Sequence, residues 1–88
     1  MKIKEGFVKQ QIQGKWLAVA TGELSRTFHG MIELNDTAAF VWDALVAGQT
    51  PDAIADAIAD VYRIPREKAE ADVQTLLSQM ADEGILDE

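Results

Sequence analysis

The chain has 88 residues, 48% of them hydrophobic, and a formal net charge of −7. A chain of this length predicts one small domain, 1–88, that buries only ~60–65% of its unfolded surface, which excludes a deep, multilayered active site. The acidic balance argues against binding to a nucleic acid backbone, which needs clustered lysine and arginine.

Further absences narrow the function classes. The chain has no cysteine, which excludes disulfides, thiolate metal sites and thiol catalysis. It shows no signal peptide and no long apolar run, so the sequence predicts a cytoplasmic protein that neither spans nor binds a membrane.

Strand patterns dominate the first third of the chain. The charged residues 1–6 are expected to fray. Residues 7–20 predict a β-hairpin, because two alternating segments flank Gln13-Gly14, and glycine supplies the positive φ of a tight turn. Residues 21–30 are expected to form a loop, with Leu24 and Phe28 tucked onto the core. A third short strand is predicted at 31–34.

The first predicted helix begins directly after this strand and runs from about residue 36 to residue 47. Asn35 is suited to cap it, because its side-chain oxygen can accept from free N–H groups of the first turn. Asp36 adds negative charge where the helix dipole favours it. Gly48 is suited to the position after its end.

Two more helices follow. Thr50 and Pro51 open the second, whose apolar stripe is predicted to be Ile54, Ile58, Val61 and Tyr62. Pro65 opens the third, and its inward face is predicted from the spacing of Ala69, Val73, Leu76, Leu77 and Met80. Gly84 ends this helix, and Ile85-Leu86 can fold back onto it. Three strands followed by three helices predict an α+β domain, with the helices on one face of a three-stranded antiparallel sheet.

The strand at 31–34 is a candidate binding edge, because an edge strand offers unpaired N–H and C=O groups to an extended peptide. If the N–H of Ile32 faces outward, an Ile32→Pro substitution should weaken such binding. The third helix would form the wall of the groove. Its candidate flank changes from apolar to polar through Leu76, Asp72, Gln79 and Lys68, although an ordinary core boundary explains the same pattern.

Catalytic patterns are lacking. His29 is the only histidine and has no companion to ligate a metal, so a loop role explains it better than catalysis. The acidic pairs near the C-terminus, Asp82-Glu83 and Asp87-Glu88, are expected to be solvated. The scattered glycines form no phosphate-binding loop. An enzymatic function is therefore remote, and a binding module remains.

The ordered motifs of the chain resemble the PqqD-like family, named for the pyrroloquinoline quinone biosynthesis protein D. No single motif is diagnostic, but the set covers about residues 3–87. Ala38 stands where the family often has glycine, which matters little inside a helix. The resemblance is carried by Gly22-Glu23, Phe28-x-Gly30-Met31-Ile32-x-Leu34-Asn35-Asp36-Thr37-x-Ala39-Phe40-Val41-Trp42, Gly48-x-Thr50, Ile54-Ala55, Ile58, Tyr62, Ala71-Asp72-Val73, Leu76-Leu77 and Gly84-Ile85-Leu86.

This resemblance implies a winged-helix-like fold and a role as a RiPP recognition element. Such a domain binds the leader segment of a ribosomally made precursor peptide, without catalysis or cofactor, and hands it to a modifying enzyme, often a radical S-adenosylmethionine protein. In the family the leader adds as a strand beside the third strand and lies against the third helix. The peptide contacts implied for this chain are Met31, Ile32, Glu33, Leu34, Lys68, Asp72, Leu76 and Gln79.

Asn35 also matches the family motif, but capping explains it fully. Many members of the family serve peptides other than the pyrroloquinoline quinone precursor, and we favour this broader interpretation for the present chain.

Alternative interpretations stay open. A winged-helix DNA-binding domain has an overlapping topology, but the basic residues near the helices are only Arg63, Arg66 and Lys68. A second alternative is a docking or adaptor subunit, which binds a biosynthetic enzyme and never a peptide. The exposed edge strand could also pair with its own copy in a homodimer.

Overall fold

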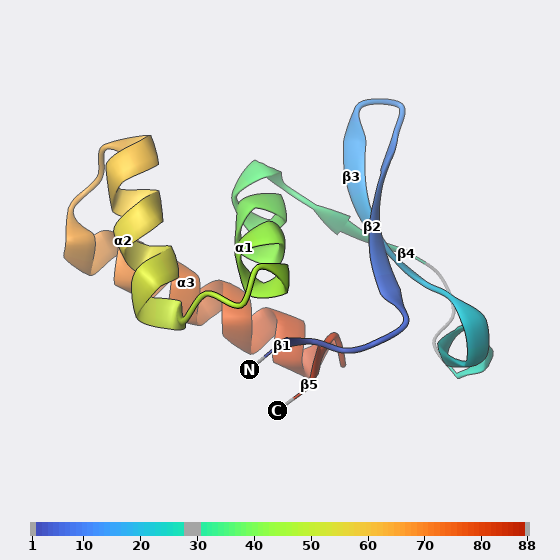
Figure 1. Cartoon of the computed structure of the whole chain (residues 1–88). Helices are drawn as coiled ribbons and strands as arrows, with labels where there is room; N and C mark the ends of the chain where they lie inside the picture. Colours follow the sequence, from blue (N-terminus) through green and yellow to red (C-terminus); the bar gives the residue numbers. More distant parts are fainter. Residues whose placement is uncertain (1, 28–30, 88) are drawn as a thin grey trace.

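The predicted order of three sheet strands and three helices is confirmed. The computed structural model describes residues 2–27 and 31–87, and all three helices lie to one side of the sheet (Figure 1). The elements are β1 (Lys2–Ile3), β2 (Phe7–Ile12), β3 (Lys15–Ala20), a 3-10 helix η1 (Gly22–Arg26), β4 (Met31–Leu34), α1 (Asp36–Val46), α2 (Pro51–Tyr62), α3 (Arg66–Asp82) and β5 (Leu86–Asp87).

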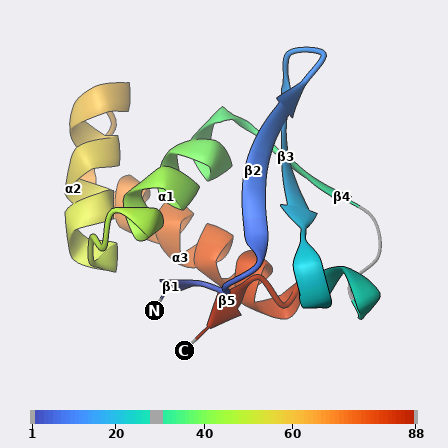
Figure 2. The ribbon, with the colours of Figure 1, turned by 45° about the vertical axis from the view of Figure 1, so that its right-hand side comes forward.

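The sheet is antiparallel with the order β2-β3-β4, so β4 is an edge strand as predicted. Gln13 and Gly14 have φ values of 52° and 79°, the two positive angles of a tight hairpin turn. The face toward the helices carries the buried residues Phe7, Ala18 and Leu34. The opposite face of the sheet is not covered by any of the helices (Figure 2).

The helix caps form as the sequence predicts. The Ala38 N–H donates to Asn35 Oδ1 at 2.8 Å, and the Ala53 N–H donates to Thr50 Oγ1 at 3.2 Å. Pro51 occupies the first turn of α2, where its missing N–H removes no helical bond. The Asn35 cap fixes the corner where β4 turns into α1.

Removing this cap should lower stability without changing the fold. We expect Asn35→Ala to reduce the free energy of unfolding by about 1 kcal/mol, because a donor of the first turn of α1 loses its acceptor. Asn35→Asp keeps the acceptor and is the matched control. Urea unfolding of both variants measures the difference; equal losses would contradict the capping role.

Three sequence expectations are wrong. Within residues 1–6, which were expected to fray, Lys2–Ile3 form β1 and pair with β5 in a separate two-stranded sheet. Val61 and Tyr62 are 58% and 41% exposed, and Ala55 is buried beside Ile54 and Ile58 instead. The stretch 21–30 is not entirely loop, because residues 22–26 form η1. The expectations for Phe28 and His29 lie outside the described residues.

The chain ends beside α3, and this contact places the helix. Ile85 is fully buried, its N–H donates to the Met80 carbonyl at 3.0 Å, and its carbonyl accepts from the Lys4 N–H at 2.7 Å. The expected return of Ile85-Leu86 onto the end of α3 is thus confirmed.

At the other end of α3, Arg66 joins it to α2. The guanidinium bonds to Asp56 and Glu70 and lies 3.7 Å from Asp52. The hydrogen bond to Asp56 is the main cause that raises the pKa of Arg66 above its usual value. Exposed ion pairs contribute little singly, but here one guanidinium contacts carboxylates of both helices.

Candidate functional site

The base of the hairpin shows which backbone groups of β3 point toward β4. The Thr21 N–H donates to the Gly6 carbonyl at 2.8 Å, and this pair directly continues the register of β2 with β3. Hydrogen-bonded and non-bonded pairs alternate along an antiparallel ladder. Counted from this bond, Trp16 and Ala18 turn their N–H and C=O groups away from β2 and toward β4.

The open edge of β4 is therefore formed by the backbone of Met31 and Glu33. Trp16 and Ala18 are in register with Leu34 and Ile32, which use their backbone groups toward β3. Met31 and Glu33 alternate with these two residues and therefore direct their N–H and C=O groups to the free side of the sheet. The N–H of Ile32 thus faces β3 and not the open edge, so Ile32→Pro does not remove a donor for the peptide. The informative position is Glu33.

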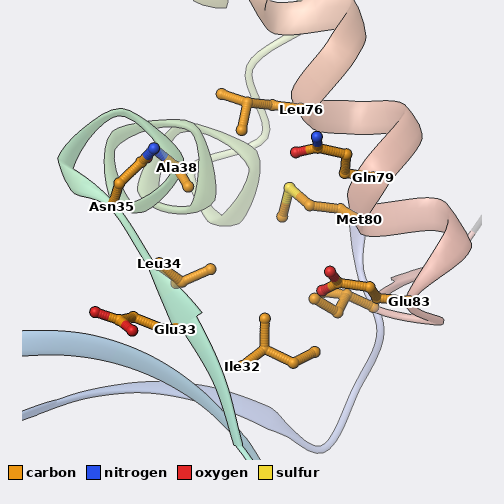
Figure 3. A pocket seen from close by; sticks show the side chains of 10 residues that line it. Ile32, Glu33, Leu34, Asn35, Ala38, Leu76, Gln79, Met80 and Glu83 are labelled. Atoms are coloured by element: carbon orange, nitrogen blue, oxygen red, sulfur yellow. The ribbon is translucent and has the colours of Figure 1, made fainter.

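A groove lies between this edge strand and α3. Ile32 and Leu34 point from β4 into it, and Leu76, Gln79 and Met80 lie on the facing side of α3 (Figure 3). Asn35 and Ala38 close it near the start of α1. The cavity within the groove measures about 100 Å³, smaller than the ~150 Å³ cavities that hold a benzene ring. It therefore suits one aliphatic side chain.

The structure brings together five of the eight predicted peptide contacts. Ile32, Glu33, Leu34, Leu76 and Gln79 line the groove. Met31, Lys68 and Asp72 do not line it. The Met31 side chain is 59% exposed, and alternation places it on the outer face of the sheet. Lys68 and Asp72 pair with each other, one turn apart, at 3.5 Å.

Sequence reasoning missed several lining residues. Met80, Glu83 and Ile85 belong to the groove, as do Asn35 and Ala38. The signal for Glu83 was present, because Leu76, Gln79 and Glu83 follow one another at helical spacings of three and four. Its acidic neighbour Asp82 favoured an interpretation as a solvated pair instead.

Among the described residues, the ionisable side chains at the groove are both acidic. They are Glu33 and Glu83. Glu33 points away from α3 (Figure 3) and lies 3.6 Å from the ammonium group of Lys15. Glu83 lies on the opposite wall, at the end of α3.

The arrangement is suited to peptide recognition. Backbone donors and acceptors at an open edge, beside an apolar groove, are what an extended peptide needs to add as a strand. Within residues 2–27 and 31–87, no three His, Cys, Asp or Glu side chains are grouped to hold a metal ion. No helix in the same ranges is long and apolar enough to cross a membrane.

The chain is similar to known proteins over most of its length. A family model described as coenzyme PQQ synthesis protein D (PqqD) matches residues 12–86. No significant match is found among curated proteins.

Two solved structures share the fold. One is titled "TbiB1 in Complex with the TbiA(beta) Leader Peptide", with a TM-score of 0.81 and 24% identity over 99% of this chain and 95% of that chain. The other, "Lasso peptide synthetase B1 complexed with the leader peptide", has a TM-score of 0.78 and 21% identity over 96% of this chain and 93% of that chain. At these identities the likeness shows the fold.

Proposed function

The chain belongs to the PqqD family, and on that premise we propose that it is a RiPP recognition element. It binds the leader segment of a ribosomally made precursor peptide by strand addition at β4 and presents it to a modifying enzyme. The observation that carries this proposal is the position of the open edge. The free backbone groups of Met31 and Glu33 lie beside an apolar groove, so one extended peptide can use both. Two proteins of the same fold are solved with leader peptides.

The mode of binding follows from the geometry of a strand. A leader beside β4 would bond through its main chain to Met31 and Glu33, which gives affinity with little dependence on sequence. Its alternate side chains would point toward α3. One of them would fill the cavity between Ile32, Leu76 and Met80, and this contact would give specificity for particular peptides.

The proposed role is positioning, without catalysis. A short flexible tether raises the effective concentration of a bound substrate at a neighbouring active site to about millimolar. The partner is a peptide-modifying enzyme, and a radical S-adenosylmethionine enzyme is our first candidate for it. Homodimer formation and the cytoplasmic location stay predictions.

Truncating the groove wall should weaken peptide capture. Leu76 is half-buried at the groove, and we expect Leu76→Ala to raise the Kd for a leader peptide about tenfold, since three buried carbons lose their contact with the peptide. Fluorescence anisotropy with labelled leader peptides encoded beside the gene measures this. Val46→Ala is the matched control, because Val46 is 67% exposed and lies on α1 outside the groove.

The same titration distinguishes the alternatives. Tight binding of the wild-type protein with equal Kd values for both variants would place the peptide elsewhere. Binding of the modifying enzyme by a protein that captures none of the leader peptides would favour the docking subunit.

A further inference from the structure

Glu83 stands at one end of the groove with its carboxylate directed toward the space between α3 and β4 (Figure 3). Ile32 lies across from it on β4. No described cationic group lies within 4.0 Å of this carboxylate, whereas the carboxylate of Glu33, which points away from α3, is close to Lys15. Glu83 is thus the unpaired charge of the groove.

The end of α3 adds to this negative potential. Glu83 is the C-terminal cap of the helix, and the last turn contains no basic residue. The free carbonyl groups of a helix C-terminus carry partial negative charge and favour lysine or arginine nearby. This helix instead ends in Asp82 and Glu83, so it lacks the cation that its terminus would favour.

We propose that the groove selects leader segments that carry a lysine or arginine facing Glu83, an inference that rests on the proposed peptide binding. Side chains two residues apart on a strand point the same way and lie ~7 Å apart. A leader with one aliphatic side chain in the cavity therefore brings a residue two or four positions away to the Glu83 end. The long stem of lysine or arginine can pack over the partly exposed Ile32 while its charged group reaches the carboxylate.

A selection from random peptides tests this specificity without knowledge of the natural leader. A library of displayed ten-residue random peptides is selected on the wild-type protein, on Glu83→Lys and on Glu67→Lys. Glu67 lies in the first turn of α3, about 160° around the helix from Glu83, so its variant has the same net charge at a distant site.

We expect the wild-type protein and Glu67→Lys to enrich peptides with an aliphatic residue and a lysine or arginine two or four positions from it. We expect Glu83→Lys to enrich aspartate or glutamate there. Enrichment of aliphatic residues with no charge preference in any variant would overturn the charge selection and leave peptide binding intact. No enrichment by the wild-type protein would overturn both proposals.

Affinities of a matched peptide pair give the size of the effect. One enriched peptide is synthesised with lysine and with glutamate at the selected position, and anisotropy measures the Kd of each. The wild-type protein should bind the lysine peptide about three- to tenfold more tightly, as expected for an exposed pair set against a like-charge contact. Glu83→Lys should reverse this preference, and 0.5 M salt should reduce it in both proteins. A preference unchanged by Glu83→Lys would overturn the proposal.

Discussion

Replacing Glu33 with proline is expected to weaken leader binding about ten- to a hundredfold while the protein remains folded. The N–H of Glu33 belongs to the open edge of β4, and proline removes this donor. A carbonyl group of the added peptide strand then loses its partner and remains buried without a hydrogen bond. Titration of a leader peptide by fluorescence anisotropy measures the loss.

Two control variants isolate the backbone contribution. Glu33→Ala removes the carboxylate and its 3.6 Å contact with Lys15 but keeps the N–H, so its Kd should stay within about twofold of the wild-type value. Ile32→Pro removes a bond to β3 and should lower the free energy of unfolding. Proline is tolerated at an edge position whose N–H faces solvent, so Glu33→Pro should unfold near the wild-type midpoint. Equal affinities for Glu33→Pro and Glu33→Ala would argue against strand addition.

Ile85→Ala is expected to reduce the free energy of unfolding by about 2–5 kcal/mol, which is a large part of the stability of a domain this small. Ile85 is fully buried, although only three residues follow it in the sequence. It packs at the end of α3, beside the sheet that β1 and β5 form, and also lines the groove. Its truncation leaves a cavity where these parts meet.

Urea unfolding followed by circular dichroism measures this loss, with Val61→Ala as the control. Val61 is 58% exposed, so its truncation should change the free energy by less than about 0.5 kcal/mol. Similar small losses in both variants would show that the C-terminal segment is not part of the core.

Local signals in the sequence were sufficient for most of the elements. The hairpin turn depends on Gln13-Gly14, and the start of α1 depends on Asn35. Each of these features is determined by residues within one or two turns of it. The edge position of β4 was predicted correctly as well, from its place as the short last strand of the sheet.

Features decided by distant contacts were missed. β1 and β5 are two-residue strands from opposite ends of the chain, and two residues show no periodicity. Val61 and Tyr62 continue the helical stripe of Ile54 and Ile58, but the helical period does not show where neighbouring elements stop covering α2. Tyr62 instead has an edge contact with Phe40, at 6.1 Å between ring centroids.

The sequence predicted one side of the candidate site better than the other. The strand side followed from the pattern at 31–34. Which of these residues faces the open edge required the register with β3, and this moved the key backbone position from Ile32 to Glu33. The residues at the far end of the groove could not be predicted without the position of the C-terminal segment, which brings Ile85 beside Met80 and Glu83.

Amide hydrogen exchange at β4 tests strand addition most directly. In the free protein, the amides of Ile32 and Leu34 should be protected by β3, whereas those of Met31 and Glu33 should exchange rapidly. With a saturating leader peptide, Met31 and Glu33 should gain protection and all four amides should exchange slowly. Peptide binding that leaves Met31 and Glu33 in rapid exchange would contradict strand addition at this edge.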